Sequence, residues 1–335
     1  MLEIVNGTVY TPTEVIHDGV VLVDGQQIAA VGKRGELTVP QGVERLDAGG
    51  GSIVPGFVNM HIHGIGGYDA MDGQVDSLRI MSRLLARHGV TSWVPTTASA
   101  PLDVQEAAVV AVRTAMQAGT GGAEILGAHI EGTYLSEQER GAHPAELLLA
   151  PKPEEYAGLL ELADDIRVFT LAPELPGALE LIRVLKERDV LVSAGHSVAI
   201  DREFAPAVDA GLSHGTHMFC NMGTLRRDNI RRVAGLVESM LLDDRVSTEI
   251  ISDGHHIAPS LMNLAFKVKG PAKLAIVTDS SGLTGLPPGR YSAFGQPVIL
   301  EEEISYVADR SAFAGSVSTM DQCLRNAIRL MDLSQ

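Results

Sequence analysis

Cysteines, aromatic residues and cationic residues are all scarce in this sequence. The two cysteines, Cys220 and Cys323, are too few for a disulfide framework and form no CxxC pair for zinc or redox chemistry. Aromatic residues make up only 4% of the chain, so we expect an interior of Val, Ile, Leu and Ala. Lys and Arg number 26 against 42 Asp and Glu, a net charge of −16 that argues against nucleic acids and anionic membranes as partners.

Long apolar runs and several common motifs are missing as well. No segment approaches the roughly 18 apolar residues of a membrane-spanning helix. The N-terminal sequence MLEIVNGTVY lacks the basic and apolar regions of a secretory signal, which together with the cysteine usage predicts a cytoplasmic protein. Neither a GxSxG elbow nor a GxxxxGK[ST] loop occurs, so serine-hydrolase and nucleotide-binding chemistry are disfavoured.

The chain divides by pattern into a short N-terminal part and a long remainder. Residues 1–54 contain short alternating segments separated by Asn6-Gly7, Asp24-Gly25 and Gly32, which favour tight turns. We therefore predict a small antiparallel β domain over 1–54. Its end, Ala48–Ser52, is glycine-rich and is expected to be a flexible hinge.

The remainder, residues 55–335, alternates apolar strand-like runs with amphipathic helical stretches. Eight strands that alternate with helices and lack polar alternation predict a parallel α/β barrel. The expected strands are Ile53–His61, Thr91–Thr96, Glu124–Glu131, Arg167–Ala172, Val190–His196, Ser213–Phe219, Ser247–Ser252 and Lys273–Asp279. The expected helices are Ser77–His88, Val104–Ala118, Glu154–Leu162, Pro176–Arg188, Asp201–Ala210, Ser260–Lys267 and Val317–Met331, with a β excursion at about 283–313.

Side chains that can bind metal or move protons gather at the predicted strand ends. The catalytic groups of such barrels lie at the carboxyl ends of the strands, where these side chains would meet. They are His61, His63, Glu131, His196, His217 and Asp279.

Four of these residues also allow a plainer interpretation. His61 and His63 point to the same side of an extended strand and can reach one cation, but they can equally be core or turn histidines. Glu131 in a buried strand needs either a metal or an arginine partner. Asp279 can accept a proton from water and return it to a leaving group, or it can cap a helix or loop.

Their joint placement favours a metal-dependent hydrolase. Glu131, His196 and His217 make a three-ligand site that leaves a position open to water. Many two-metal barrels use a modified lysine on the fourth strand as a bridge, but this strand has no lysine, so any bridge must come from Glu131.

Motifs along nearly the whole chain resemble the N-acetylglucosamine-6-phosphate deacetylases of the amidohydrolase superfamily. The matching segments, in the family's order, are PGFVNMHIHG at 55–64, GAHIEG at 127–132, GAH at 141–143, LAPE at 171–174, SAGHS at 193–197, TH at 216–217, DGHH at 253–256, VTD at 277–279 and AGS at 314–316.

The resemblance implies a distorted (β/α)8 barrel with a small β-sandwich domain and one or two divalent ions, Zn2+ or Fe2+. Glu131, His196 and His217 would hold the first ion, and His61 and His63 would complete a second site. Asp279 would move the proton, and His143 and His256 would contact the substrate. The reaction implied is deacetylation of N-acetylglucosamine 6-phosphate to glucosamine 6-phosphate and acetate.

The chain departs from the family pattern in three places. Thr133-Tyr134 replace a proline and an aromatic residue. The family's phosphate-binding Asn-Ala pair after the strand-6 histidine is replaced by a segment in which the asparagine is displaced to Asn221, and Cys220 and Asn221 are the expected substrate contacts there. The family's phosphate-binding arginine, often supplied by a neighbouring subunit of a homodimer, has candidates here in Arg227 and Arg231, with Arg226 and Arg232 beside them. Family members also usually continue past the last barrel helix, so a C-terminal tail with further β strands is expected.

Two alternatives remain open at this point. A relative could act on another N-acyl amino sugar, such as N-acetylgalactosamine 6-phosphate, or on a cyclic amide. A catalytically silent binding barrel is disfavoured, because it needs neither the full ligand set nor Asp279.

Overall fold

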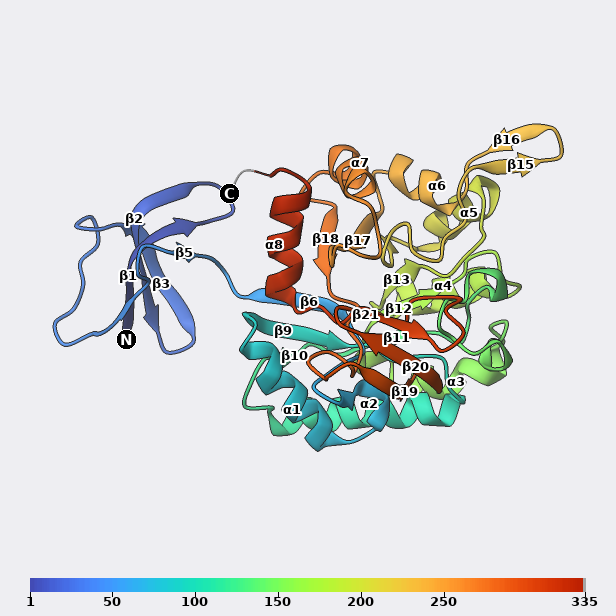
Figure 1. Cartoon of the computed structure of the whole chain (residues 1–335), viewed down its shortest axis with the longest axis horizontal. Coiled ribbons are helices and arrows are strands. Elements are labelled where there is room, and N and C mark those ends of the chain that lie inside the picture. The colour runs from blue at the N-terminus through green and yellow to red at the C-terminus, as the bar shows by residue number, and fades with distance from the viewer. Residues whose placement is uncertain (334–335) are drawn as a thin grey trace. The chain divides into compact units, whose positions relative to one another are not determined.

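The computed structural model describes residues 1–333, which separate into two units, Met1–Gly56 and a second that begins at Phe57 (Figure 1). None of the helices within residues 1–333 has the length and apolar character needed to span a lipid bilayer.

The N-terminal unit is a five-stranded mixed sheet in which β1 is central. β1 pairs antiparallel with β2 and parallel with β4 and β5, while β3 pairs antiparallel with β2. Valines, isoleucines and leucines form two small clusters, one built on Val5, Val20 and Leu22 and the other on Val9, Ile16 and Val21. The strands are β1 (Leu2–Tyr10), β2 (Val15–Asp24), β3 (Gln27–Lys33), β4 (Glu44–Asp47) and β5 (Ser52–Ile53).

Two of the turns expected in this unit were wrong, and so was the hinge. Asn6-Gly7 lies inside β1, where the pairing register shifts, and Gly32 lies inside β3; only Asp24-Gly25 makes a hairpin turn. A left-handed residue fits a bulge as well as a turn, which explains the error at Asn6 (φ 59°). Ala48–Ser52 is a hydrogen-bonded turn, because Gly50 N–H donates to Asn6 C=O at 2.6 Å and Thr8 N–H donates to Gly51 C=O at 3.0 Å.

The second unit has a TIM-barrel-like fold, as expected. Parallel strands form two sheets, ordered β10-β9-β6 and β11-β12-β13-β14-β17-β18. Backbone hydrogen bonds join their edges: Asp279 N–H donates to His61 C=O at 3.0 Å, and Thr97 N–H donates to His129 C=O at 2.8 Å. These strands are β6 (Phe57–Ile62), β9 (Val90–Pro95), β10 (Glu124–Ile125), β11 (Ala128–Glu131), β12 (Ile166–Leu171), β13 (Leu191–Ala194), β14 (His214–Gly215), β17 (Ser247–Ile251) and β18 (Leu274–Val277). Each of the eight expected runs overlaps at least one of them, with ends that differ by a few residues.

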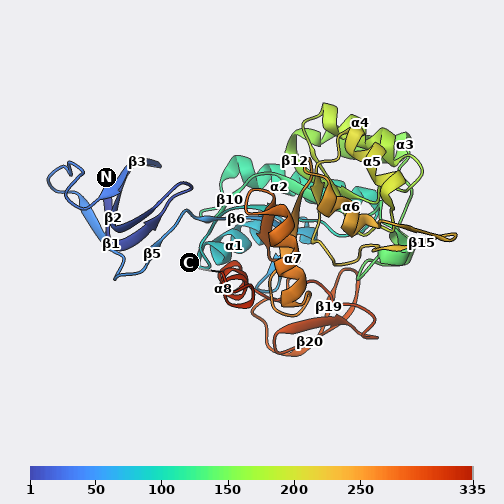
Figure 2. The same ribbon diagram turned by 90° about the horizontal axis from the view of Figure 1, so that it is seen from above.

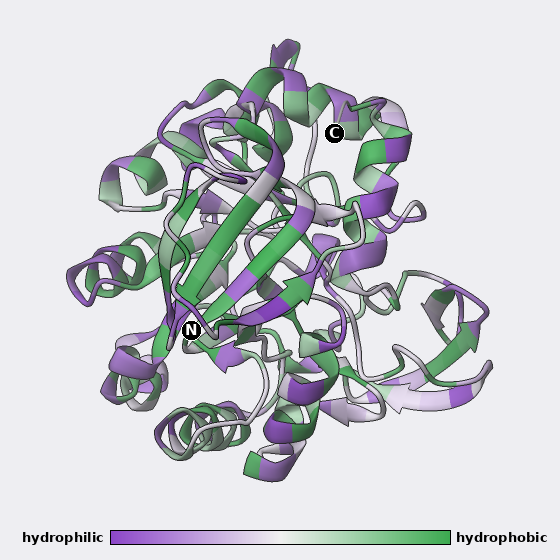
Figure 3. Cartoon of the chain, turned by 90° about the vertical axis from the view of Figure 1, so that its left-hand side faces the viewer, coloured by the Kyte–Doolittle hydropathy of each residue, from purple (hydrophilic) through white to green (hydrophobic). Residues whose placement is uncertain are grey.

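The helices that follow the strands are amphipathic, with hydrophobic and hydrophilic segments alternating along them (Figure 3). All seven expected helices are present, and the short α6 was missed because its one apolar stretch is too brief to show a helical period. The α-helices are α1 (Val75–Ala86), α2 (Leu102–Ala118), α3 (Pro153–Glu161), α4 (Ala178–Glu187), α5 (Asp201–Ala210), α6 (Leu236–Leu242), α7 (Pro259–Lys269) and α8 (Met320–Leu330). Short 3-10 helices occupy Ala70–Asp72, Glu137–Glu139, Ala145–Leu147 and Ala163–Asp165.

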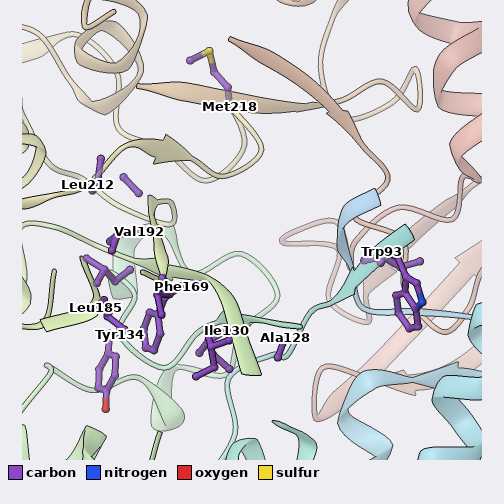
Figure 4. Close-up of a cluster of buried hydrophobic side chains, with 14 of the residues drawn as sticks. Trp93, Ala128, Ile130, Tyr134, Phe169, Leu185, Val192, Leu212 and Met218 are labelled. Carbon is purple, nitrogen blue, oxygen red and sulfur yellow. The ribbon is translucent and has the colours of Figure 1, made fainter. Parts of the chain in front are cut away.

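The core between strands and helices consists mainly of aliphatic side chains with a few large aromatic ones (Figure 4). Trp93 is fully buried, and its indole N–H donates to Ser82 Oγ at 3.0 Å, which satisfies its one polar group. Tyr134 and Phe169 stack with their ring planes 9° apart. This packing fixes the strands whose ends carry the candidate site.

The second unit also contains three small antiparallel sheets: β7 with β8, β15 with β16, and β19 with β20 and β21. A β hairpin of β15 and β16 projects from the second unit in both views (Figures 1 and 2), and β19, β20 and β21 form a sheet with its own apolar cluster around Val298, Leu300 and Val307. The bounds are β7 (Gly64–Ile65), β8 (Tyr68–Asp69), β15 (Arg226–Asp228), β16 (Arg231–Val233), β19 (Gly289–Ala293), β20 (Gln296–Glu301) and β21 (Ile304–Val307).

The close approach of Gly64 to the loop after β18 generates a prediction. A Cβ at Gly64 would lie 2.4 Å from both Gly282 N and Tyr68 O, which are backbone atoms that cannot swing aside. We expect Gly64→Ala to lower the free energy of unfolding by about 1–3 kcal/mol in urea titrations.

The matched control is Gly289→Ala, whose Cβ would meet only the Tyr291 ring at 3.3 Å. Equal stability of the two variants would contradict this account of Gly64.

Candidate metal centre

Six candidate ligands come from five strands of the barrel, and they reach the site in two ways. His61 lies within β6 and Glu131 ends β11, so the strands themselves aim these two side chains. His63 follows directly after β6, on the same side as His61. His196, His217 and Asp279 each lie two residues beyond the end of a strand, after β13, β14 and β18.

The three residues beyond the strand ends share a left-handed backbone. Their φ angles are 48° at His196, 31° at His217 and 49° at Asp279. This region is unfavourable for residues other than glycine by about 1–3 kcal/mol each, and such strain tends to accumulate at functional sites. The left-handed step turns the chain out of the strand at the point where its side chain faces the centre.

One carboxylate oxygen of Glu131 faces His61, His63 and Asp279. Glu131 Oε2 lies 3.2 Å from His61 Nε2 and 3.1 Å from His63 Nε2, and Asp279 Oδ1 lies 3.4 and 3.1 Å from the same two nitrogens. Ligands held about 2.0–2.1 Å from a tetrahedral zinc ion are about 3.3 Å apart, so the spacing matches that of a coordination shell.

The other oxygen of Glu131 faces His196 and His217. Glu131 Oε1 lies 3.2 Å from His196 Nε2 and 2.9 Å from His217 Nε2, and the two nitrogens are 3.1 Å apart. These three atoms form a second set, and their residues line the adjoining cavity. Glu131 therefore lies between the two sets of donors, with one carboxylate oxygen facing each.

The outer nitrogens of two histidines are held so that the inner ones carry lone pairs. His61 Nδ1 lies 3.0 Å from Glu249 Oε2, and His196 Nδ1 lies 2.8 Å from the Glu139 carbonyl oxygen. Both partners only accept hydrogen bonds, so each Nδ1 carries the proton and each Nε2 is free to bind a cation. Histidines that ligate metals are held in this way.

The donor set fits a divalent transition metal. Four imidazole nitrogens and two carboxylates, with no thiolate, suit Zn2+ or Fe2+. All six side chains are buried, and the buried His63 Nδ1 and His217 Nδ1 have no hydrogen-bond partner within residues 1–333. The fit supports a metal centre here, with Glu131, His196 and His217 at one half and His61, His63 and Asp279 at the other.

The charges of the cluster oppose the effect of burial. Burial lowers the pKa of His63, but hydrogen bonds to Asp279 and Glu131 raise it to about 9. Burial raises the pKa of Asp279, but the charge on His61 and the hydrogen bond from His63 bring it down to about 2. The carboxylates thus stay ionised and favour the binding of positive charge at the cluster.

His143 lies beside the cluster but differs from its ligands. The backbone N–H of Ser99 donates to His143 Nδ1 at 3.2 Å, so the imidazole proton is on Nε2, 4.0 Å from Glu131 Oε2. Burial and the nearby charge of His196 lower the pKa of His143 to about 3 and keep the ring neutral. A neutral Nε2–H suits a hydrogen-bond donor to a substrate oxygen better than a metal ligand.

A cavity of about 370 Å3 opens from the cluster. Its walls include the predicted substrate contacts His143, Cys220, Asn221 and His256. Asp253 Oδ2 accepts a hydrogen bond of 2.7 Å from His256 Nδ1; burial lowers the pKa of His256, and this bond raises it above its usual range. The sheet of β19, β20 and β21 and the loop after it add Phe294, Tyr306, Arg310 and Phe313 to the walls.

The structure does not bring Arg227 and Arg231 to this cavity. They lie on β15 and β16, where both are exposed, and neither is among the lining residues. His129 and His214 lie below the cluster and are held by hydrogen bonds, His129 to Thr96 and Thr170 and His214 to Ser247 and Glu249.

Sequence reasoning missed Glu249 and Arg310. Glu249 is a charged residue in the buried strand β17, so the argument that singled out Glu131 would have found it. Arg310 lies in the segment that looked like an excursion between barrel elements, and no local signal shows that this segment folds over the cavity.

A TIM-barrel-like fold with a histidine and carboxylate cluster at its strand ends is typical of metal-dependent hydrolases, and this places the chain in that class.

No protein-family model matches the chain. It is 36% identical to an N-acetylgalactosamine-6-phosphate deacetylase of Escherichia coli O157:H7 over 293 residues, covering 87% of this chain and 76% of the relative. It is 34% identical over 287 residues to an N-acetylglucosamine-6-phosphate deacetylase of Lysinibacillus sphaericus, covering 85% of this chain and 73% of the relative.

A solved structure shares the fold over almost the whole chain. It is a variant of the N-acetyl-D-glucosamine-6-phosphate deacetylase of Mycobacterium smegmatis in complex with N-acetyl-D-glucosamine-6-phosphate, with a TM-score of 0.90, 30% identity and coverage of 99% of this chain and 84% of that one. The chain belongs to the N-acetylglucosamine-6-phosphate deacetylase family of amidohydrolases. The expected family membership is confirmed.

The shared position of Glu131 generates a prediction about metal content. Glu131→Gln keeps the size of the side chain but removes the charge that faces both donor sets. We expect this variant to lose most bound metal from both halves, measured by elemental analysis after dialysis.

Glu3→Gln is the matched control, because Glu3 is also buried but pairs with Arg45 at 2.8 Å in the N-terminal unit. Full metal content in Glu131→Gln would show that Glu131 does not join the two sets.

Proposed function

We propose that this protein is a metal-dependent hydrolase that removes the acetyl group of N-acetylglucosamine 6-phosphate, giving glucosamine 6-phosphate and acetate. The observation that carries the proposal is the pair of donor sets sharing Glu131 at the mouth of the cavity. We assign Glu131, His196 and His217 to one ion and His61, His63 and Asp279, with Glu131, to a second, and we favour Zn2+ over Fe2+.

Asp279 is the residue proposed to move the proton. A bound metal polarises the acetamide carbonyl and makes water a better nucleophile. The low pKa of Asp279 keeps it ionised at neutral pH, so it can take a proton from the attacking water. It then delivers this proton to the amide nitrogen as the carbon–nitrogen bond breaks, releasing acetate and the amine.

The other proposed contacts orient the substrate. The Nε2–H of His143 is available to donate to the carbonyl oxygen as negative charge develops there. Arg310 brings positive charge to the wall of the cavity, His256 is held there by Asp253, and Asn221 adds an amide. Arg310 is the one arginine among the described residues that line the cavity. Its guanidinium group suits an anionic substrate such as a sugar phosphate.

We also infer a homodimer in which Arg227 or Arg231 reaches the cavity of the neighbouring subunit. The supporting observation is the projecting β15–β16 hairpin, whose tip leaves Ile230 94% exposed. We further propose that the sheet of residues 1–54 is one part of a small β-sandwich domain, since Ile28 and Leu46 are exposed apolar residues on its strands.

The proton-transfer role of Asp279 leads to a direct test. We expect Asp279→Asn to lower kcat for acetate release by about 10²–10⁴-fold, because an amide cannot accept the proton. Acetate is measured by a coupled assay, and metal content is measured in parallel.

Asp332→Asn, at an exposed position after α8, serves as the control for loss of an aspartate charge. Unchanged turnover in Asp279→Asn would remove Asp279 from this role, and no acetate from the wild-type protein would overturn the proposed reaction.

A second candidate substrate is N-acetylgalactosamine 6-phosphate, favoured by the 36% identity to a deacetylase of that name. The two sugars differ only in the configuration at one hydroxyl group. We expect kcat/KM for N-acetylglucosamine 6-phosphate to be at least tenfold above that for N-acetylgalactosamine 6-phosphate. The reverse ratio would make the second sugar the substrate and leave the deacetylation chemistry in place.

A further inference from the structure

Beneath the metal centre lies a buried carboxylate that the proposed reaction does not use. Glu249 is in the middle of β17, with an exposed fraction of 0%, and it does not line the cavity. No lysine or arginine pairs with it among residues 1–333. A buried carboxylate is costly unless its oxygens accept several hydrogen bonds, so its contacts indicate what it is for.

Three N–H groups converge on Glu249, and two of them belong to candidate metal ligands. Its Oε2 accepts from His61 Nδ1 at 3.0 Å and from the backbone N–H of His217 at 3.2 Å. Its Oε1 accepts from His214 Nε2 at 3.3 Å, and His214 Nδ1 is bound in turn to Ser247 Oγ at 2.7 Å. One oxygen therefore touches a ligand from each half of the centre.

We propose that Glu249 is a positioning residue that directs His61 toward the second metal ion and ties its placement to the backbone of His217. Glu249 fixes the His61 proton on Nδ1, so that Nε2 faces Glu131 and Asp279 with its lone pair. It also supports the main chain at His217, whose left-handed backbone (φ 31°) has to be held by its surroundings. The inference rests on the proposed metal-dependent function and extends it to the number of ions.

Glu249 contacts the two halves of the centre unequally, so a site with one ion at Glu131, His196 and His217 would not need it. The set of Glu131, His196 and His217 receives only a backbone contact from it, whereas His61 receives the full charge-assisted hydrogen bond. Glu249 therefore acts mainly on the half built from His61, His63 and Asp279. Carboxylates that hold ligating histidines typically change metal affinity by about 10- to 100-fold when they are replaced.

Glu249→Gln is the decisive variant, because it keeps the volume of the side chain. Its amide oxygen can still accept from His61, and its NH2 group can face His214, which can shift its own proton to Nδ1 and Ser247. The fold is therefore retained while the negative charge beside His61 is lost. Ser247→Ala is the matched control on the same strand, since it removes the far end of the network and touches no ligand.

The experiment measures Zn2+ stoichiometry by elemental analysis and the two Zn2+ affinities by chelator competition. We expect two ions in the wild type and in Ser247→Ala. In Glu249→Gln we expect the weaker-bound ion to lose about 10- to 100-fold in affinity while the other stays bound. A double variant, Glu249→Gln with His61→Ala, should lose no more than His61→Ala alone.

Each other outcome overturns a defined claim. Two ions bound with unchanged affinities in Glu249→Gln would make Glu249 merely structural and leave the proposed function intact. A single bound ion in the wild type would also overturn the inference about Glu249 and would leave the proposed function intact. No metal in the wild type would overturn the proposed function itself. If Glu249→Gln fails to fold, His61→Gln replaces it; wild-type Zn2+ affinities in that variant would also overturn the inference.

Discussion

The burial of one carboxylate, that of Glu131, is the constraint on which the site depends. Its exposed fraction is 1%, and burial on its own raises its pKa, but the charge on His61 and hydrogen bonds from His196 and His217 hold that pKa well below its usual range. Each oxygen therefore needs positive charge or N–H donors around it. The strand that carries Glu131 and the strands that supply these partners must end at the same height, which a closed parallel barrel achieves.

The site also depends on local backbone strain at three of its residues. His196, His217 and Asp279 all leave their strands through a left-handed residue, and each does so two residues after the strand ends. The surrounding packing, including the fully buried Phe169 on β12 beside β13, holds the strands in this geometry. Rigid strands and strained ends together hold the donors in place.

Much of the site could be predicted, and the failures have physical causes. The six cluster residues were found because strand ends and residue types are local properties, and the fold confirms that they meet. Asn6-Gly7 misled because a left-handed residue serves a bulge as readily as a turn. The short helix α6 escaped because its apolar stretch is too brief to show a helical period. The hydrogen-bonded turn at Ala48–Ser52 depends on contacts with Asn6 and Thr8, which no local pattern records.

The sequence by itself determined the barrel and the residue types at its strand ends, because periodicity and the cost of burying charge are readable one segment at a time. It also determined the family, through motifs in a fixed order. Only the tertiary structure decided which oxygen of Glu131 faces which histidines, which nitrogen of His143 carries the proton, and that Glu249 lies beneath His61. These depend on separations of about 3 Å between residues up to 188 positions apart, and hydrogen bonds at that range are set by the closed fold.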